Sequence, residues 1–335
     1  MFKSCEPDDY WDYYTQLYLV FYIKRTYQMM KDEIKKAAAF LREGKLVAFP
    51  TETVYGLGGN ALSDTAVAAI YAAKGRPEFN PLIVHVHSLA EAKKYARFNA
   101  AAEKLAKKYW PGPLTLVLPR TQDCTLSLLV SAGLDSVAIR VPAHPLAQEL
   151  LHEAKLPIAA PSANRSGRIS PTEAAHVREE LGDKVAMILD GGACAVGIES
   201  TVVDMTGDAP VILRPGGLVI PAKAGIHLQN DKIKSPGMLA SHYAPSKPMR
   251  INATYVRTYE ALLAFGADVP DGAALVENLS PTGNLQEAAA NLFRMLRRLD
   301  ASHAKSIAVM PIPEEGLGIA INDRLKRAAT TAQIS

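Results

Sequence analysis

Residues 45–76 read KLVAFPTETVYGLGGNALSDTAVAAIYAAKGR, and this stretch says more about fold and function than any other part of the chain. An apolar run from Leu46 to Phe49 predicts a buried strand. After Pro50-Thr51-Glu52-Thr53, a turn rich in glycine leads into a short helix that ends at Lys74 and Arg76. The pattern delivers hydroxyl groups and two cations to one edge of a sheet, where open α/β folds bind their ligands. Recognition of a phosphate or a carboxylate is the expected use; the alternative is a tight turn that only requires glycine, with hydroxyls that cap the next helix.

Further segments place polar or rigid residues at the ends of apolar runs. In sequence order they are Asn80-Pro81-Leu82-Ile83-Val84-His85, Trp110-Pro111-Gly112-Pro113-Leu114-Thr115, Ser136-Val137-Ala138-Ile139-Arg140-Val141-Pro142, Ala160-Pro161-Ser162-Ala163-Asn164-Arg165-Ser166-Gly167 with Ser170-Pro171-Thr172, and Gly197-Ile198-Glu199-Ser200-Thr201 with Asp204 and Leu213-Arg214-Pro215-Gly216. This ordered set resembles the YrdC-like domain of the threonylcarbamoyl-AMP synthases, from about Ile34 to Gly217. Two later stretches resemble the hinge and the final helix of the longer, two-domain synthases: Ser241-His242-Tyr243-Ala244-Pro245 and Gly316-Leu317-Gly318-Ile319-Ala320-Ile321-Asn322-Asp323-Arg324-Leu325.

Helical and β-branched segments alternate along the chain, which predicts an α/β domain built on a twisted mixed sheet. Helices are expected at about Lys31 to Arg42, Asp64 to Ala73, Ala101 to Lys108, Pro145 to Ala154 and Thr172 to Leu181. Strands are expected at Leu82 to Val86, Thr115 to Leu118, Val137 to Val141, Met187 to Leu189, Thr201 to Asp204 and Val211 to Leu213.

From Met249 onward the pattern reads strand, helix, strand (Ala273 to Val276), helix (Gln286 to Leu299), strand (Ser306 to Met310) and helix (Ile319 to Ala329), which predicts a smaller Rossmann-like three-layer domain. The expected organisation is an N-terminal extension, a YrdC-like catalytic domain, a linker rich in Pro and Gly, and this small domain, over residues 1–30, 31–218, 219–248 and 249–335.

The composition describes an ordinary globular protein large enough for two cores, with 335 residues, 48% hydrophobic and 21% charged residues, and a net charge of +3. So small a positive excess does not by itself indicate nucleic-acid binding. The cysteines Cys5, Cys124 and Cys194 have no metal-ligand spacing, and a reducing cytoplasm is the expected location. The apolar run Leu17 to Ile23 is too short to span a bilayer, so no membrane contact is expected. The first 30 residues are interpreted as an extension, or alternatively as an accessory helix.

The resemblance implies a nucleotidyltransferase that converts L-threonine, bicarbonate and ATP into L-threonylcarbamoyladenylate and pyrophosphate. The product serves downstream threonylcarbamoyl-transferase machinery that modifies adenosine 37 of tRNA, and a direct contact with tRNA is possible within this scheme. Both chemical steps bring anions together, so the site is expected to supply positive charge and positioning more than a covalent nucleophile.

Residue roles follow from matching motif positions. The resemblance assigns threonine binding to Thr53, His85, Arg140 and Ser200, and ATP binding to Lys74, Arg76, Asn80, Ser136, Ser162, Ser170, Arg214 and Tyr243. A guanidinium suits the threonine carboxylate because it can make two parallel hydrogen bonds. Mg²⁺ is implied as the companion of ATP; its ligands are unknown from the sequence, and Glu199 and Asp204 are the nearest acidic candidates.

Each residue also has a plainer explanation. An arginine at a strand end is often solvated, a histidine in an apolar strand is often a hydrogen-bonded core residue, and the serines can form turns. Two other functions use the same kind of domain. One is binding of structured RNA without adenylation, and the other is carbamoyl transfer in metallocentre maturation, which the lack of zinc-finger cysteines disfavours.

Overall fold

The computed structural model describes residues 28–75, 80–221, 227–228 and 243–330. Residues 28–42 form a helix, so helical structure begins before the predicted domain start at residue 31; the rest of the predicted extension lies outside the described residues. None of the helices in the described ranges is long and apolar enough to cross a membrane. Most of the predicted linker also lies outside them.

The first domain is built on a mixed sheet that contains ten strands within the described residues, in the order β10-β9-β8-β4-β5-β3-β6-β2-β1-β7. The strands are β1 (Val47–Phe49), β2 (Gly56–Asn60), β3 (Ile83–His85), β4 (Leu114–Pro119), β5 (Ser136–Arg140), β6 (Ile158–Ala159), β7 (Met187–Ile188), β8 (Thr201–Asp204), β9 (Val211–Arg214) and β10 (His227–Leu228). The predicted strands of this domain and its mixed sheet are confirmed. The central strands are apolar and buried on both faces, which holds their ends in fixed register.

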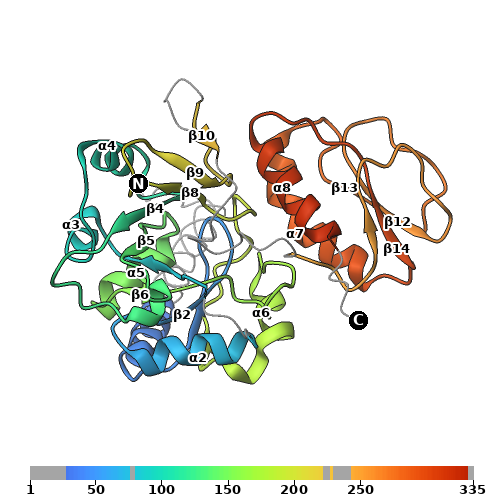
Figure 1. Ribbon diagram of the computed structural model, residues 1–335. Helices are drawn as coiled ribbons and strands as arrows, with labels where there is room; N and C mark the ends of the chain where they lie inside the picture. The colour runs from blue at the N-terminus through green and yellow to red at the C-terminus, as the bar shows by residue number, and fades with distance from the viewer. Residues whose placement is uncertain (1–27, 76–79, 222–226, 229–242, 331–335) are drawn as a thin grey trace, which may run out of the picture.

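Helices cover this sheet (Figure 1). They are α2 (Asp64–Lys74), α3 (Leu89–Ala92), α4 (Ala100–Tyr109), α5 (Pro145–Ala154) and α6 (Ala174–Leu181), with short 3₁₀ turns η1 (Leu128–Ser131) and η2 (Gly182–Lys184). Helix α2 begins at Ser63, whose side chain accepts a hydrogen bond from the Ala66 N–H, and ends at Gly75 in the left-handed conformation. These caps fix where Lys74 leaves the helix.

The second domain is a parallel sheet in the order β11-β14-β12-β13. Its elements are β11 (Met249–Arg250), β12 (Glu260–Ala264), β13 (Leu275–Asn278), α7 (Leu285–Ala301), β14 (Ser306–Val309) and α8 (Leu317–Ala329). The helix predicted between the first two strands of this domain is wrong. The sequence EALLA at that place forms the central strand β12, because a strand buried on both faces needs a continuous apolar run and tolerates residues that favour helices.

The two faces of this second sheet are covered differently. Ala261 and Leu263 pack with apolar residues of α7 and α8. Leu262 and Ala264 face the other way, where the residues packed against them include Val256 from an irregular loop. Helices α7 and α8 therefore form the layer between the second sheet and the first domain, as Figure 1 shows on its right side.

The two domains share an apolar contact. Val54, Ile169 and Ile198 of the first domain belong to one buried cluster with Leu292 and Phe293 of α7. The backbones of the two domains approach closely at Gly197, where an added Cβ would lie 2.5 Å from the Ala290 Cα and 2.6 Å from the Ala289 carbonyl oxygen. Only glycine permits this distance.

We predict that Gly197→Ala weakens the docking of the second domain. Its φ of +74° disfavours alanine, and the clash with α7 adds to this cost. Gly192→Ala is the matched control, because Gly192 has a φ of +75° and open space around it. We expect urea unfolding to give Gly197→Ala a free energy of unfolding about 1–3 kcal/mol below that of the control. Equal losses in the two variants would contradict a tight interdomain contact at this glycine.

Candidate active site

A cleft lies at the ends of several strands of the first domain. Most of its lining residues carry polar or charged side chains, and they come from segments far apart in the sequence. The lining residues are Thr51, Thr53, Val54, Gly56, Lys74, Ile83, His85, Arg140, Ala160, Pro161, Ser162, Ser166, Glu199, Ser200, Arg214 and Tyr243. The cleft therefore gathers all the residues predicted to bind threonine and several of those predicted to bind ATP.

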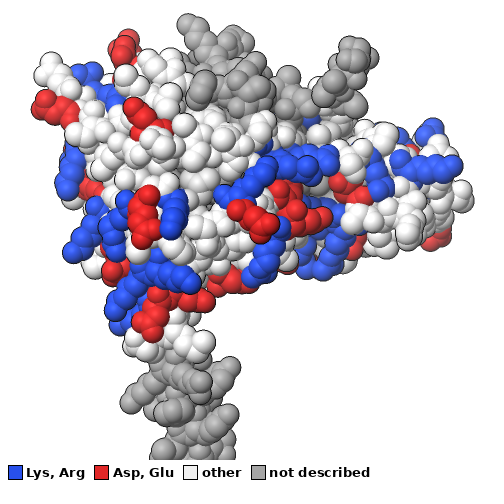
Figure 2. All heavy atoms as spheres, turned by 90° about the horizontal axis from the view of Figure 1, so that it is seen from below, with Lys and Arg blue, Asp and Glu red and all other residues white. Residues whose placement is uncertain are grey.

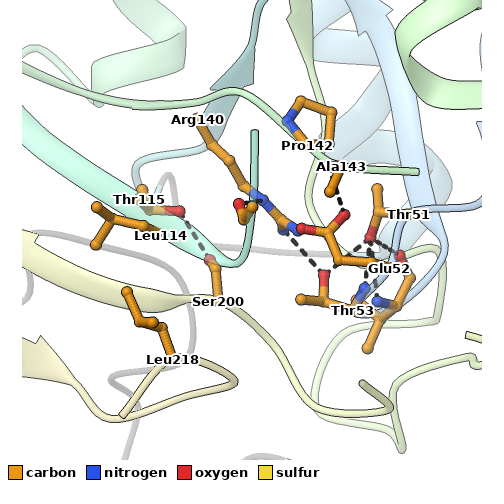
Figure 3. Close-up of polar contacts among 12 residues, drawn as sticks. Thr51, Glu52, Thr53, Leu114, Thr115, Arg140, Pro142, Ala143, Ser200 and Leu218 are labelled. Atoms are coloured by element: carbon orange, nitrogen blue, oxygen red, sulfur yellow. Dashed lines mark hydrogen bonds and ion pairs between the residues drawn. The ribbon is translucent and has the colours of Figure 1, made fainter. Parts of the chain in front are cut away.

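Arg140 occupies one wall of the cleft and is 3% exposed (Figure 3). It ends β5, which runs parallel to β3, so that Arg140 and His85 are paired across the two strands. Its Nη1 donates to the Thr53 Oγ1 at 2.9 Å, its Nη2 to the Glu52 Oε1 at 2.5 Å, and its Nε to the Gly112 carbonyl at 3.2 Å. A guanidinium has five N–H donors, so one donor on each terminal nitrogen remains for a ligand.

Glu52 is the counter-charge that holds this arginine, and the sequence analysis assigned it no role. Its second oxygen accepts a hydrogen bond from the Ala143 N–H at 3.0 Å. Burial would raise the pKa of Glu52, but the Arg140 cation and these hydrogen bonds outweigh burial and hold that pKa below its ordinary value. The carboxylate stays ionised and keeps Arg140 oriented along the cleft. Its place between Thr51 and Thr53 is the one local signal in the sequence, because its partner Arg140 lies 88 residues away.

His85 is a neutral side chain in this site. Burial and the nearby Arg140 charge lower the pKa of His85 to about 3. The ring meets Phe49 edge to face, with 6.0 Å between the centroids, and its Nδ1 is buried without a hydrogen-bond partner among the described atoms. A buried polar nitrogen that lines a cleft and lacks a protein partner is suited to a ligand hydrogen bond.

A second wall is formed by the loops before β8 and after β9. The Ser200 Oγ lies 2.7 Å from the Thr115 Oγ1, and the Arg214 Nη2 donates to the Ser200 carbonyl at 2.8 Å. Gly216 packs against this loop so closely that an added Cβ would lie 2.3 Å from the Glu199 carbonyl oxygen. A hydrogen bond and close backbone packing thus hold the two loops together at the cleft.

Lys74 lines the cleft at the end of α2. Its Nζ donates to the carbonyl oxygens of Ser162 and Asn164, each at 2.6 Å. Lys74 therefore shapes the loop that carries Ser162 as well as adding a positive charge to the cleft.

Other predicted residues take different places. Arg76 lies outside the described residues. Asn80 is buried, with its carbonyl accepting from the Tyr71 hydroxyl, and Ser136 starts β5 at the end opposite Arg140. The Ser170 Oγ donates to the Glu199 Oε1 at 2.5 Å and stands behind that carboxylate. Tyr243 is 1% exposed and lines the cleft.

No metal site is evident among the described residues, where no group of three or more His, Cys, Asp or Glu side chains is suitably placed. The carboxylate of Glu199 is already engaged by Ser170 and Arg324. Asp204 ends β8 and accepts hydrogen bonds from the N–H and hydroxyl of Thr206. The described side chains therefore form no ready-made protein cage for Mg²⁺, and the ligands of the ion stay unassigned.

The fold and cleft define an α/β protein with a cleft that carries several cations at the strand ends of a mixed sheet, and with a second domain docked beside it. Residues 39–216 match the protein family described as telomere recombination, and residues 201–330 match the threonylcarbamoyl-AMP synthase C-terminal domain. With both domains present, the chain belongs to the family of two-domain threonylcarbamoyl-AMP synthases, which are nucleotidyltransferases of tRNA threonylcarbamoyladenosine modification.

Relatives support this membership over nearly the whole chain. Threonylcarbamoyl-AMP synthases of Pyrococcus abyssi and Bacillus subtilis are 43% and 42% identical to it, over 89% of this chain in both cases and 94% and 93% of theirs. The crystal structure of the P. abyssi protein complexed with L-threonine superposes with a TM-score of 0.82 at 42% identity, and covers 89% of this chain and 94% of that one. The predicted family, fold class and enzyme class are confirmed.

We predict that Glu52→Gln lowers the free energy of unfolding by about 3–5 kcal/mol, because it leaves the buried Arg140 without its counter-charge. A carboxyl with a lowered pKa contributes stability above its ordinary pKa of 4.5, and that stability is lost as the pH falls through the folded-state pKa. The difference between wild type and variant should therefore shrink from pH 7 to pH 3 in urea titrations.

Glu43→Gln is the control for this prediction, since Glu43 and Lys45 form an exposed ion pair. Exposed pairs contribute about 0–1 kcal/mol. A loss as small in Glu52→Gln as in Glu43→Gln would show that Glu52 does not anchor the arginine.

Proposed function

We propose that the cleft joins L-threonine, bicarbonate and ATP into L-threonylcarbamoyladenylate with release of pyrophosphate. The observation that carries the proposal is the gathering of two buried arginines, Arg140 and Arg214, with Lys74 in one polar cleft. Burying this many cations is energetically unfavourable unless anions balance their charge. The threonine carboxylate and the triphosphate are such anions.

The threonine half of the cleft is assigned to Arg140, Thr53, His85 and Ser200. The two remaining N–H donors of Arg140 suit a carboxylate, and the neutral imidazole of His85 offers a hydrogen bond without adding charge near the amine. A substrate amine must be unprotonated to attack bicarbonate, so an uncharged neighbour is favourable. The ATP half is assigned to Lys74, Ser162, Arg214 and Tyr243, which line the cleft. The resemblance alone supports ATP-binding roles for Arg76, Asn80, Ser136 and Ser170.

The chemistry proceeds by direct attack. The threonine amine attacks the bicarbonate carbon, and a C–O bond breaks with loss of water to give the carbamate. A carbamate oxygen then attacks the α-phosphorus, from which pyrophosphate leaves. No covalent protein intermediate is required, and the buried Cys194 is unsuited to one, because burial raises the pKa of its thiol to about 12. The residues act by holding the reactants together and by balancing negative charge in a sheltered space.

Mg²⁺ enters the proposal only as the usual companion of ATP, supplying charge to the triphosphate oxygens. Because the described side chains form no ready-made protein cage for the ion, the residue assignments above involve no step through it. The downstream threonylcarbamoyl transferase and a direct tRNA contact remain proposals from the resemblance. On the face drawn in Figure 2, Lys and Arg are interspersed with Asp and Glu, which gives a direct RNA-binding function little support.

We predict that the protein, given ATP, Mg²⁺ and bicarbonate, releases pyrophosphate faster with L-threonine than with L-serine. Loss of one buried methyl group is worth about 1 kcal/mol, or roughly fivefold in kcat/KM. The reaction without amino acid gives the background. Equal release with threonine, with serine and without amino acid would contradict the proposed reaction.

We also predict that Arg140→Lys and Arg214→Lys separate the two halves of the cleft. Lysine keeps a cation beside the buried carboxylates but loses the guanidinium fork. Loss of charge-assisted contacts worth about 1.5–3 kcal/mol should raise the threonine KM of Arg140→Lys about 10- to 100-fold, and the ATP KM of Arg214→Lys similarly. Each variant serves as the control for the other in titrations of both substrates. If both variants raised the KM for threonine and the KM for ATP by similar factors, the assignment of separate threonine and ATP halves would be refuted.

A further inference from the structure

Arg324 belongs to the second domain, yet its side chain serves the first. It lies on α8 and is 1% exposed. Its Nε donates to the Glu199 Oε2 at 3.0 Å, and its Nη1 donates to the Pro215 carbonyl at 2.7 Å. Its Nη1 also donates to the Asp323 Oδ2 at 2.9 Å, within its own helix. A single side chain thus bridges the domains through two separate loops.

Both loops carry residues of the cleft. Glu199 precedes Ser200, and Pro215 follows Arg214, and the Gly217 N–H donates to the Glu199 carbonyl at 2.9 Å. The guanidinium carbon of Arg324 also lies 5.5 Å from the ring centroid of Tyr243, a further lining residue. Because the fork of a guanidinium is rigid, it fixes the separation of the two loops that it joins.

The charge of Arg324 also stabilises the ionised form of the Glu199 carboxylate. Glu199 is buried beside the cleft and would be neutral without nearby cations. Burial would raise the pKa of Glu199, but the charges of Arg324 and Arg214 and the Ser170 hydrogen bond outweigh burial and lower it. Arg324 supplies a counter-charge for this carboxylate from outside the cleft. The negative charge of Glu199 is therefore balanced by Arg324 as well as by Arg214.

We propose that Arg324 is a positioning residue for the ATP half of the cleft, acting through Pro215 on Arg214 and through Glu199 on Ser170. The docked second domain then supports the cleft without lining it. The inference rests on the proposed function for the identity of the ligand. The threonine half has its own supports within the first domain, because Arg140 is held by Glu52 and Gly112.

The proposal makes the effect of Arg324 selective between the two substrates. A change at Arg324 should disturb Arg214 and Tyr243 and leave Arg140 and Thr53 in place. Ser200 keeps an anchor of its own in Thr115 of β4, at 2.7 Å between the hydroxyl oxygens. A general loss of folding would weaken the binding of both substrates together.

The test measures dissociation constants for ATP and for L-threonine by calorimetry, steady-state KM values, and thermal unfolding. The variants are Arg324→Gln and Arg324→Lys. The matched control is Lys326→Gln on the same helix, which removes a positive charge from an exposed ion pair with Glu314 inside the second domain.

We expect Arg324→Gln to weaken ATP binding at least about tenfold and threonine binding less than about twofold. Arg324→Lys should recover part of the ATP affinity, since it restores the charge but not the fork.

Arg324→Gln removes one of the two arginine charges that balance the buried Glu199 and can unfold for that reason. The double variant Glu199→Gln with Arg324→Gln removes both charges and keeps the test decisive, because the bridge to Pro215 is still lost. Unchanged ATP affinity in a folded Arg324→Gln or in the double variant would overturn the proposal, as would equal weakening for both substrates. If the wild type binds ATP but releases no pyrophosphate with threonine, the proposed function fails, while the ATP affinities still decide the role of Arg324.

Discussion

Buried cations must keep a counter-charge when no ligand is bound, and this constraint organises both parts of the cleft. Arg140 is neutralised by Glu52 from the loop after β1, and Arg324 by Glu199 from the loop before β8. Isolated charges in such positions would cost several kcal/mol each. The carboxylates therefore hold the arginine side chains in fixed orientations. Each guanidinium group has more N–H donors than one carboxylate can accept from. The surplus donors of Arg140 are what an anionic substrate can use.

The sheet makes this arrangement possible by bringing distant segments to one place. His85 and Arg140 are cross-strand neighbours because β3 and β5 are parallel, and Thr201 pairs with Leu114 because β8 runs parallel to β4. Two glycines allow close backbone contacts that a Cβ would block. Gly216 does so at the cleft, and Gly197 does so where the second domain docks. The same backbone that shapes the cleft thus shapes the surface on which the second domain docks.

The sequence was sufficient for the longer elements of the first domain, but not for β2, β6, β10 or α3, and it assigned binding roles to about half of the residues that line the cleft. The roles of Arg140, His85 and Arg214 came from the resemblance, because a polar residue at the end of a buried run also has plainer explanations. The roles of Glu52 and Arg324 were not predicted, because their partners lie 88 and 125 residues away in the sequence. Local patterns were also misleading at β12, where EALLA favours a helix in isolation and tertiary burial makes it a strand.

The bridge at Arg324 has a thermodynamic consequence for the two domains. If docking of the second domain raises the affinity for the nucleotide by some factor, the bound nucleotide must favour docking by the same factor. The apolar cluster around Phe293 supplies docking energy that does not depend on ligand, whereas the ion pair with Glu199 ties part of that energy to the geometry of the cleft. A synthase whose product is a labile adenylate benefits from such coupling, because the bound nucleotide then favours the docked arrangement that orders the cleft. The second domain therefore acts as a support for the cleft, although none of its described residues line it.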